Sequence, residues 1–275
     1  MQTPPIIVDQ RSLIQHRERA GSGRENFLRR LNADDVQERL KEVNRSFTDV
    51  AIVTPTPEIW HPALPGSRIV SDDGILDLEQ GSHDVVIHDL CLHWANDPVG
   101  QLVQCRRALR PDGLLIATLF GGQTLHELRS ALAEAEVRVY GGLSPRVVPM
   151  ADIREMGALL QRAGLALPVA DSATFPVSYA SPFGLMRDLR AMGEGNALSG
   201  RLRTFTRRAF FAAADEIYRL HFEKEGRIPA TFEIITLTGW APSETQPKAL
   251  RPGSASTRLA DVLGTSETSL LRSDD

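Results

Sequence analysis

The sequence predicts an α/β fold built on an open, doubly wound sheet, and three neighbouring segments carry that prediction. Val85–His88 and Leu114–Leu119 are short apolar runs typical of buried strands. Between them, Val99–Leu109 has the apolar spacing of an amphipathic helix, and the Pro-Asp-Gly turn within Leu109–Gly113 reverses the chain. Strand, helix and strand in this order indicate parallel neighbours, with a functional crevice expected at the carboxyl end of the first strand.

The first 45 residues are expected to form a helical arm. Asp9–Ala20 is a polar segment with helical character, and Gly21–Gly23 interrupts it. Apolar residues then recur at steps of three and four from Phe27 to Val43, which predicts one broken or two short amphipathic helices. Ala33–Asp35 is expected to begin the second of these, because acidic residues favour the first turn of a helix.

Two short strands are expected before the central pair. Val50–Val53 is an apolar run that Thr54–Pro57 ends, and Arg68–Val70 leads into the turn-forming residues Ser71–Gly74. The prolines and the glycine between these two strands predict a loop.

The second half of the chain continues the alternation of helices and strands. Helices are expected at Thr124–Val137, at Asp152–Ala163, from Ser181 to Gly193 and at Arg207–Phe222, and a last strand at Thr231–Leu237. Leu165–Ala170 and Ala173–Val177 each contain a proline, so these two segments suit the edge of a sheet. The main domain is therefore expected over residues 46–240, with a helical cap at about 140–230. The Pro- and Ser-rich residues 241–275 are expected to be a largely disordered tail.

Composition excludes several classes of protein. A net charge of −4 gives no electrostatic case for a nucleic-acid partner. No stretch approaches the ~20 apolar residues of a membrane span, and no targeting segment is evident, so the expected location is cytoplasmic. Cys91 and Cys105 match no metal or redox spacing and are expected to be reduced packing residues. His83, His88 and His93 recur every five residues, which alternates their faces on a strand, so no metal site is predicted.

A nucleotide cofactor on such a sheet normally needs a glycine-rich turn after the first strand, because the backbone approaches the ligand closely there. Here the first strand runs into Thr54–Pro57, and no glycine occurs between Gly23 and Gly66. Proline supplies no amide donor and cannot adopt the positive φ of a glycine turn. The sequence therefore predicts that the ordinary cofactor cradle is missing.

A longer series of motifs resembles a known family. The motifs are His93-Trp94, Asn96-Asp97, Leu109–Gly113, Phe120–Gly122, Thr124-Leu125 and Glu127–Arg129, followed by Pro182–Asn196, Pro229–Thr231 and Gly239-Trp240. Over residues 83–240 the chain resembles the class I S-adenosylmethionine (SAM)-dependent methyltransferase superfamily. Within it, the chain is most similar to the methyltransferase-like assembly factors of respiratory complex I, of the arginine-hydroxylase type, and more distantly to the carrier-protein methyltransferases of biotin synthesis.

The resemblance implies a Rossmann-like class I methyltransferase sheet, here with a shortened N-terminal half and a helical insertion or cap. It also implies SAM as cofactor, which the missing cradle argues against, and a protein partner such as a complex I subunit. By the same resemblance, Asp72 would reach the adenine amino group, and His88, Asp89 and Leu90 would flank the methionine part of SAM. The substrate or partner side would comprise His93, Trp94, Gly121, Gly122, Asp188 and Asn196; no catalytic residue is assigned.

Each of these residues also has a purely structural interpretation. Asp72 lies in an ordinary turn sequence, and Asp97-Pro98 suits a helix cap. His93 could be a histidine satisfied by a backbone carbonyl, and Trp94 could be a core aromatic. Gly121 and Gly122 could allow a tight turn whose amides hold a carboxylate or phosphate.

Three functions remain open at this point. The first is a methyltransferase-like protein that acts on a protein partner and has a degenerate cofactor site. The second is a catalytically inactive binding or assembly module, with Leu250–Ser254 and Thr257–Leu263 as a docking peptide. The third is a small-molecule methyltransferase with a rearranged pocket.

Overall fold

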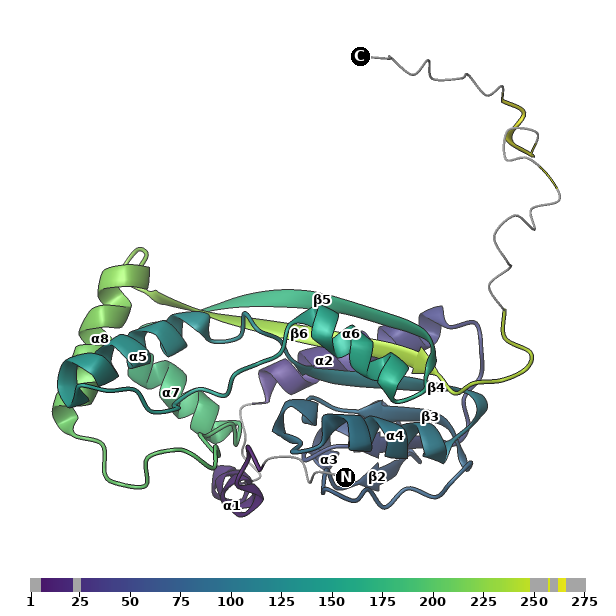
Figure 1. Ribbon diagram of the computed structural model, residues 1–275, viewed down its shortest axis with the longest axis horizontal. Helices are drawn as coiled ribbons and strands as arrows, with labels where there is room; N and C mark the ends of the chain where they lie inside the picture. The colour runs from purple at the N-terminus through teal and green to yellow at the C-terminus, as the bar shows by residue number, and fades with distance from the viewer. Residues whose placement is uncertain (1–5, 22–25, 248–256, 258–261, 266–275) are drawn as a thin grey trace, which may run out of the picture. The chain divides into compact units, whose positions relative to one another are not determined.

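Six strands form one sheet in the order β2-β1-β3-β4-β6-β5, of which the first four run parallel and the last two antiparallel (Figure 1). They are β1 (Val50–Val53), β2 (Arg68–Val70), β3 (His83–His88), β4 (Leu109–Phe120), β5 (Ala166–Tyr179) and β6 (Ile228–Trp240). The computed structural model describes residues 6–21, 26–247, 257 and 262–265, and the chain divides into two units, residues 1–243 and 244–275. The strand order of the first unit confirms the predicted α/β class.

After β1 the chain first adds β2 on one side of it and then crosses over to add β3 on the other side. The carboxyl ends of β1 and β3 are therefore the switch point of the sheet. The common doubly wound order 3-2-1-4-5-6 has three strands on the first side of that point. This sheet has two, β1 and β2, which accounts for the shortened N-terminal half.

Helices cover both faces of the parallel strands, as the near-continuous apolar strand sequences require. They are α1 (Gln10–Ala20), α2 (Phe27–Glu42), α3 (Pro57–Ala63), α4 (Pro98–Ala108), α5 (His126–Tyr140), α6 (Ile153–Arg162), α7 (Pro182–Ala191) and α8 (Arg208–Phe222), with a 3-10 turn, η1 (Leu92–Trp94). Residues of α2 and α3 pack with Ile52 and Ile87 on one face. Residues of α4 and α6 pack with Ala51 and Val86 on the other. The alternation of neighbouring strand residues between faces thus produces two cores.

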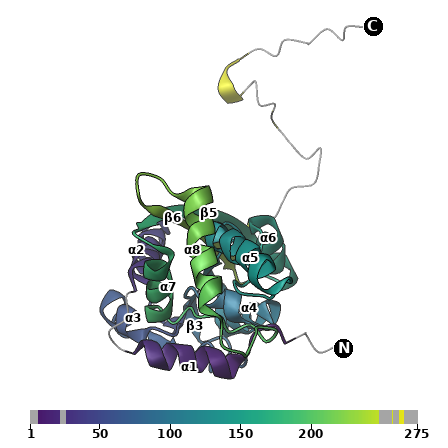
Figure 2. The same ribbon diagram turned by 90° about the vertical axis from the view of Figure 1, so that its left-hand side faces the viewer.

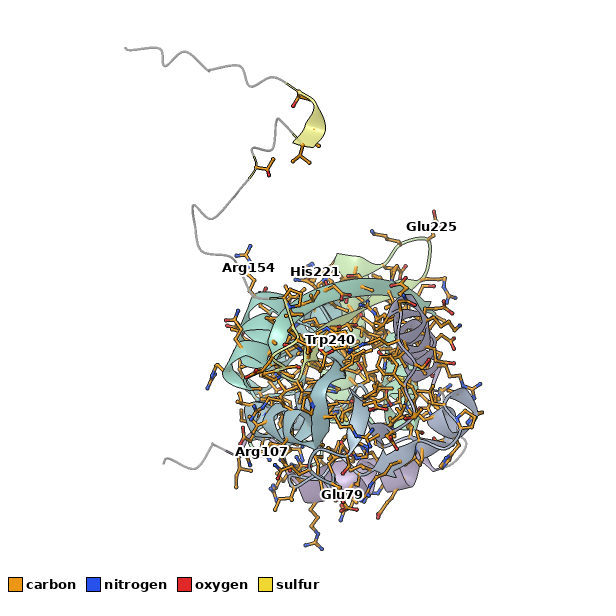
Figure 3. The ribbon with its side chains drawn as sticks, turned by 90° about the vertical axis from the view of Figure 1, so that its right-hand side faces the viewer. Glu79, Arg107, Arg154, His221, Glu225 and Trp240 are labelled. Atoms are coloured by element: carbon orange, nitrogen blue, oxygen red, sulfur yellow. The ribbon has the colours of Figure 1, made fainter. Side chains whose placement is uncertain are left out.

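Helices α5, α7 and α8 form a third core beyond the end of the parallel strands, around Phe120, Phe232 and Ile234. We name this layer the helical cap. Helices α7 and α8 fall within the predicted cap region of about 140–230 and α5 precedes it, and the layer lies at the end where β5 and β6 extend past the parallel strands (Figure 1). Helix α1 packs beside α7 (Figure 2). At its other end β6 finishes at Trp240, with the Arg45 guanidinium 5.2 Å from its ring centroid (Figure 3).

Side-chain caps are found at several of the predicted helix starts. Asp97 accepts a hydrogen bond from the Gly100 backbone N–H at the start of α4, and Ser181 does the same for Gly184 at the start of α7. Asp9 and Asp152 cap α1 and α6 through their side chains. Because each cap satisfies an N–H group that the helix cannot, these residue types mark helix starts reliably.

Four predictions about elements were wrong. Helix α2 is continuous, and Ala33–Asp35 lies inside it. The segment expected to be a loop between β1 and β2 contains α3, which begins at Pro57 because proline suits the first position of a helix. The predicted Leu109–Gly113 turn forms the start of β4, and the two proline-containing segments form one strand, β5.

The predicted edge position of β5 is confirmed. Cys91 and Cys105 are buried and free, as expected. The proposed docking segment Leu250–Ser254 lies outside the described residues, as does most of Thr257–Leu263. In the described part of the chain, no helix is both long enough and apolar enough to cross a membrane.

Candidate functional site

The switch point contains a carboxylate that is completely buried. Asp89 follows β3, and its backbone N–H donates to the Val53 carbonyl 2.8 Å away across the crevice. Its Oδ2 accepts hydrogen bonds from Thr54 Oγ1 at 2.7 Å and Trp60 Nε1 at 2.8 Å, and its Oδ1 accepts one from Asn32 Nδ2 at 2.8 Å. Protein side chains therefore fill the space at the carboxyl ends of β1 and β3, and they satisfy the carboxylate that they surround.

A buried arginine connects Asp89 to a second carboxylate. Arg29 lies 3.6 Å from Asp89 Oδ2 and 3.0 Å from Glu194 Oε1, and its side chain is 4% exposed. Glu194 Oε2 accepts a hydrogen bond from Trp94 Nε1 at 2.6 Å and lies 3.4 Å from His93 Nε2. We name Asp89, Arg29 and Glu194 the buried ion triad. Such a triad is tolerable in a core only because its hydrogen bonds are nearly complete.

The charges within the triad set its protonation state. Burial alone would raise the pKa of Glu194, but the hydrogen bond from His93 and the charges of His93 and Arg29 lower it to about 2. Burial would likewise lower the pKa of Arg29, and the charges of Asp89 and Glu194 raise it instead. Both groups are therefore ionised at neutral pH.

Asp72, expected to contact adenine, pairs with the N-terminal arm instead. Arg17 of α1 donates through Nη1 to both carboxylate oxygens of Asp72, at 2.8 and 2.9 Å. Asn96 fastens the start of the arm by accepting from the backbone N–H of Val8 at 2.8 Å and donating to its carbonyl at 3.0 Å. Gln10 adds a hydrogen bond to the Trp94 carbonyl. The arm thus contacts two segments near the expected cofactor position, the turn at Asp72 and the stretch from Trp94 to Asn96.

His88 and Leu90 point into packed protein. His88 Nε2 lies 2.7 Å from Gln101 Oε1, and Nδ1 lies 3.4 Å from Cys91 Sγ. Leu90 has φ 42°, an uncommon value outside glycine, and its N–H donates to Thr118 Oγ1. The structure thus places Asp72, His88, Asp89 and Leu90 in one region, each in contact with the chain's own groups.

Stability should fall as the pH drops below 6.5. Burial lowers the pKa values of His88 and His93 below the ordinary 6.5, so between 6.5 and the lowered values the unfolded chain binds more protons than the folded chain. We therefore expect a lower urea midpoint at pH 5.5 than at pH 7.5. The carboxylates with lowered pKa values, such as Glu194, add to this loss only below about 4.5. A midpoint that stays constant or rises over this interval would contradict the assignment of neutral buried histidines.

The turn after β4 holds a carboxylate of the same chain, but through the Gln123 amide and not through the amides of the glycine pair. The Gly121 N–H donates to the Glu233 carbonyl at 2.9 Å, and the Gln123 N–H donates to Glu233 Oε2 at 2.8 Å. A Cβ atom at position 121 would lie 2.5 Å from Glu233 Oε2, so any larger residue there would displace the Glu233 side chain. Gly122 has no such close contact.

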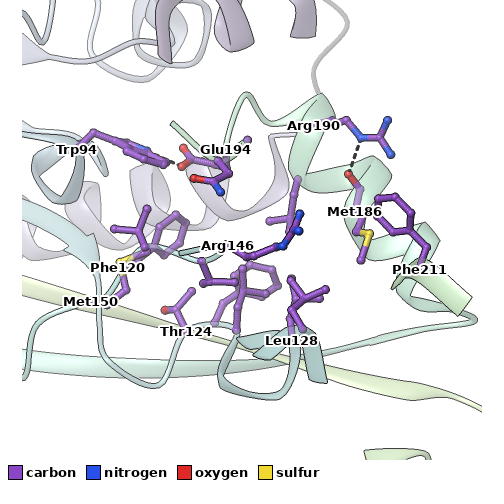
Figure 4. Close-up of a pocket in the computed structure, with 18 of the residues that line it drawn as sticks. Trp94, Phe120, Thr124, Leu128, Arg146, Met150, Met186, Arg190, Glu194 and Phe211 are labelled. Atoms are coloured by element: carbon purple, nitrogen blue, oxygen red, sulfur yellow. Dashed lines mark hydrogen bonds between the residues drawn. The ribbon is translucent and has the colours of Figure 1, made fainter. Parts of the chain in front are cut away.

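A cavity of about 340 Å³ lies between the sheet and the helical cap (Figure 4). Most of its lining is apolar and aromatic and comes from η1, β4, β6, α5, α7, α8 and the loops next to them: Trp94, Phe120, Leu125, Leu128, Leu132, Val147, Val148, Met150, Met186, Leu189, Phe210, Phe211 and Phe232. Of the predicted substrate-side residues, Trp94 and Asn196 line it. His93 packs behind it, with its ring centroid 4.8 Å from that of Phe120, and Asp188 lies on α7 without lining it.

Sequence reasoning missed Arg29, Asn32 and Trp60 at the switch point. The only signal was their position in the helix. Arg29 and Asn32 fall on the same helical face as the apolar residues Leu28 and Val36, and a polar residue on that face must be buried. Glu194 stood within a recognised motif but had no role assigned to it.

Comparison with known proteins finds similarity to methyltransferase-like sequences. Residues 20–117 match the family model described as "Methyltransferase domain". The chain is 42% identical over 197 residues to "Arginine-hydroxylase NDUFAF5, mitochondrial" of Dictyostelium discoideum, covering 71% of this chain and 45% of that protein. It is 35% identical over 199 residues to the zebrafish (Danio rerio) protein of the same name, covering 72% and 62%. It is also 36% identical over 184 residues to "Malonyl-[acyl-carrier protein] O-methyltransferase" of Xylella fastidiosa, covering 67% and 59%.

These findings confirm the resemblance that the motifs indicated. The chain spans between 45% and 62% of the length of these curated relatives.

Proposed function

The chain is a methyltransferase-like homologue of the NDUFAF5 arginine-hydroxylases, and we propose that it acts on a protein partner without binding SAM at its switch point. The observation that carries this proposal is the filled crevice. Asp89, Trp60, Asn32 and Arg29 occupy the carboxyl ends of β1 and β3, where an open α/β sheet binds its ligand.

The turn after β1 supports the proposal independently. Thr54–Pro57 contains only two backbone N–H groups, because proline has none. The Thr54 N–H donates to the Val70 carbonyl at 3.0 Å, and the Thr56 N–H donates to Thr54 Oγ1 at 3.0 Å. A nucleoside cofactor is normally held by free amides at this position, and these are already used.

Calorimetric titration with SAM tests the proposal. We expect heats equal to those of dilution for the wild-type chain, and the same for S-adenosylhomocysteine. Saturable binding at submillimolar concentration would overturn the degenerate site and favour the third function, a small-molecule methyltransferase with a rearranged pocket. The protein must be shown to be folded in the same buffer by its urea transition.

The proposed partner is a subunit of respiratory complex I, in keeping with the assembly-factor resemblance. Arginine hydroxylation of that partner is the activity that the relatives' name suggests. A pull-down of the assembled and partly assembled subunits tests the partnership. Truncation after Ser243 is the matched variant for the tail, because it keeps Ala241, whose N–H donates to the Gly113 carbonyl. Equal recovery by both proteins would remove the tail as the docking element, and no recovery by either would contradict the partnership.

We also propose that the protein is cytoplasmic, as its composition predicts, and in this it would differ from the relatives. The relatives carry "mitochondrial" in their names. Cell fractionation of the native host tests the location directly.

A further inference from the structure

The cavity beneath the helical cap has the size of a small-molecule site, since such pockets usually enclose about 300–1,000 Å³. Its walls are aromatic and aliphatic, and they include Phe120, Phe210, Phe211 and Phe232. A volume lined in this way favours an apolar molecule of matching size.

Most polar groups in the lining are already satisfied by the chain itself. Glu194 is held by Arg29 and Trp94. Thr124 Oγ1 exchanges hydrogen bonds with the backbone of Glu233, and the Asn196 amide donates to the Pro145 carbonyl. These groups therefore shape the cavity without offering a free partner to a ligand.

Arg190 is the exception. Three charged side chains line the cavity, and the other two, Glu194 and Arg146, are paired with Arg29 and Glu136. Arg190 donates through Nε to the Met186 carbonyl at 3.2 Å (Figure 4), and its terminal nitrogens have no carboxylate partner among the described residues. An exposed guanidinium at an apolar cavity provides a recognition point for a carboxylate or phosphate group.

The amino end of α8 lies close to the same wall of the cavity. Arg146 stacks on the Phe210 ring of α8, 4.2 Å from its centroid. Helix α8 begins at Arg208, two residues before Phe210, with no acidic residue in its first turn and no side-chain cap. The amino end of a helix carries a partial positive charge, so an anion beside this wall is favoured.

We propose that this cavity binds a small amphipathic molecule with one anionic group, its apolar body enclosed by the aromatic walls and its carboxylate paired with Arg190. The inference goes beyond the proposed function, because the cavity and the switch point are lined by different residues apart from the shared Trp94 and Glu194.

Calorimetry with decanoate as the probe tests this inference on the full chain. We expect saturable binding, and a decrease in affinity of about tenfold in Arg190→Gln, the effect of one charge-assisted hydrogen bond. Arg187→Gln is the matched control, because Arg187 is exposed on the same helix and does not line the cavity. Phe211→Ala should also weaken binding by removing part of the apolar wall.

Three outcomes would overturn the inference. They are no binding of decanoate, equal loss in Arg190→Gln and Arg187→Gln, and equal affinity for decanoate and neutral 1-decanol. Urea transitions of each variant show whether the fold is retained, and both arginine variants replace exposed side chains, which rarely changes stability by more than about 0.5 kcal/mol. Failure here leaves the result of the SAM titration unaffected, so the two proposals are tested separately.

Discussion

Asp89→Ala is expected to lower the free energy of unfolding by about 3–5 kcal/mol, because removing one member of a buried ion pair leaves the other charge uncompensated. Of its two carboxylate partners Arg29 would keep only Glu194, and the donors of Asn32 and Trp60 would lose their acceptor. Urea unfolding followed by circular dichroism measures the change.

Asp77→Ala provides the matched control. The Asp77 side chain is 93% exposed and pairs with Arg68 on the surface, so its removal should change stability by less than about 0.5 kcal/mol. Similar urea midpoints for the two variants would mean that the buried ion triad does not stabilise this fold.

Trp60→Ala should have an effect of the same size, about 3–5 kcal/mol, because truncation of a buried tryptophan removes apolar contacts and leaves a cavity. Trp60 is completely buried among Ile52, Ile87 and Val36, and it also donates to Asp89. The same urea titration measures the loss.

Trp60→Phe separates the two contributions, since it keeps most of the apolar volume and removes only the N–H donor. We expect the Phe variant to lose less than the Ala variant. Added indole should raise the melting temperature of Trp60→Ala alone, because a ligand that fills a cavity in the folded state stabilises that state. Equal losses in the two variants, with no effect of indole, would contradict the packing role of Trp60.

The sequence was most informative where local chemistry decides the structure. Apolar runs located β1, β3 and β4, and side-chain caps such as Asp97 and Ser181 marked helix starts. The edge position of β5 followed from its prolines, because proline has no N–H to donate and is tolerated where one side of a strand has no neighbour. These features depend on a few adjacent residues, so a single sequence contains them.

The sequence was least informative where distant residues meet. Arg29, Asn32 and Trp60 converge on Asp89 from separations of 60, 57 and 29 residues. Arg29 and Asn32 have polar side chains in positions that face the core, and a helical pattern based on apolar residues passes over them. The pairing of Asp72 with Arg17 was invisible for the same reason.

The two edges of the sheet differ in how they avoid self-association. Strand β2 has three residues, too few to template another chain, whereas β5 is a long, largely exposed strand that would otherwise invite one. Pro168 and Pro176 remove amide donors along β5, and the register shift between Ala166 and Val169 distorts its start. Short length at one edge, and prolines with a register shift at the other, thus oppose the edge-to-edge pairing that closure into a barrel prevents in other β architectures.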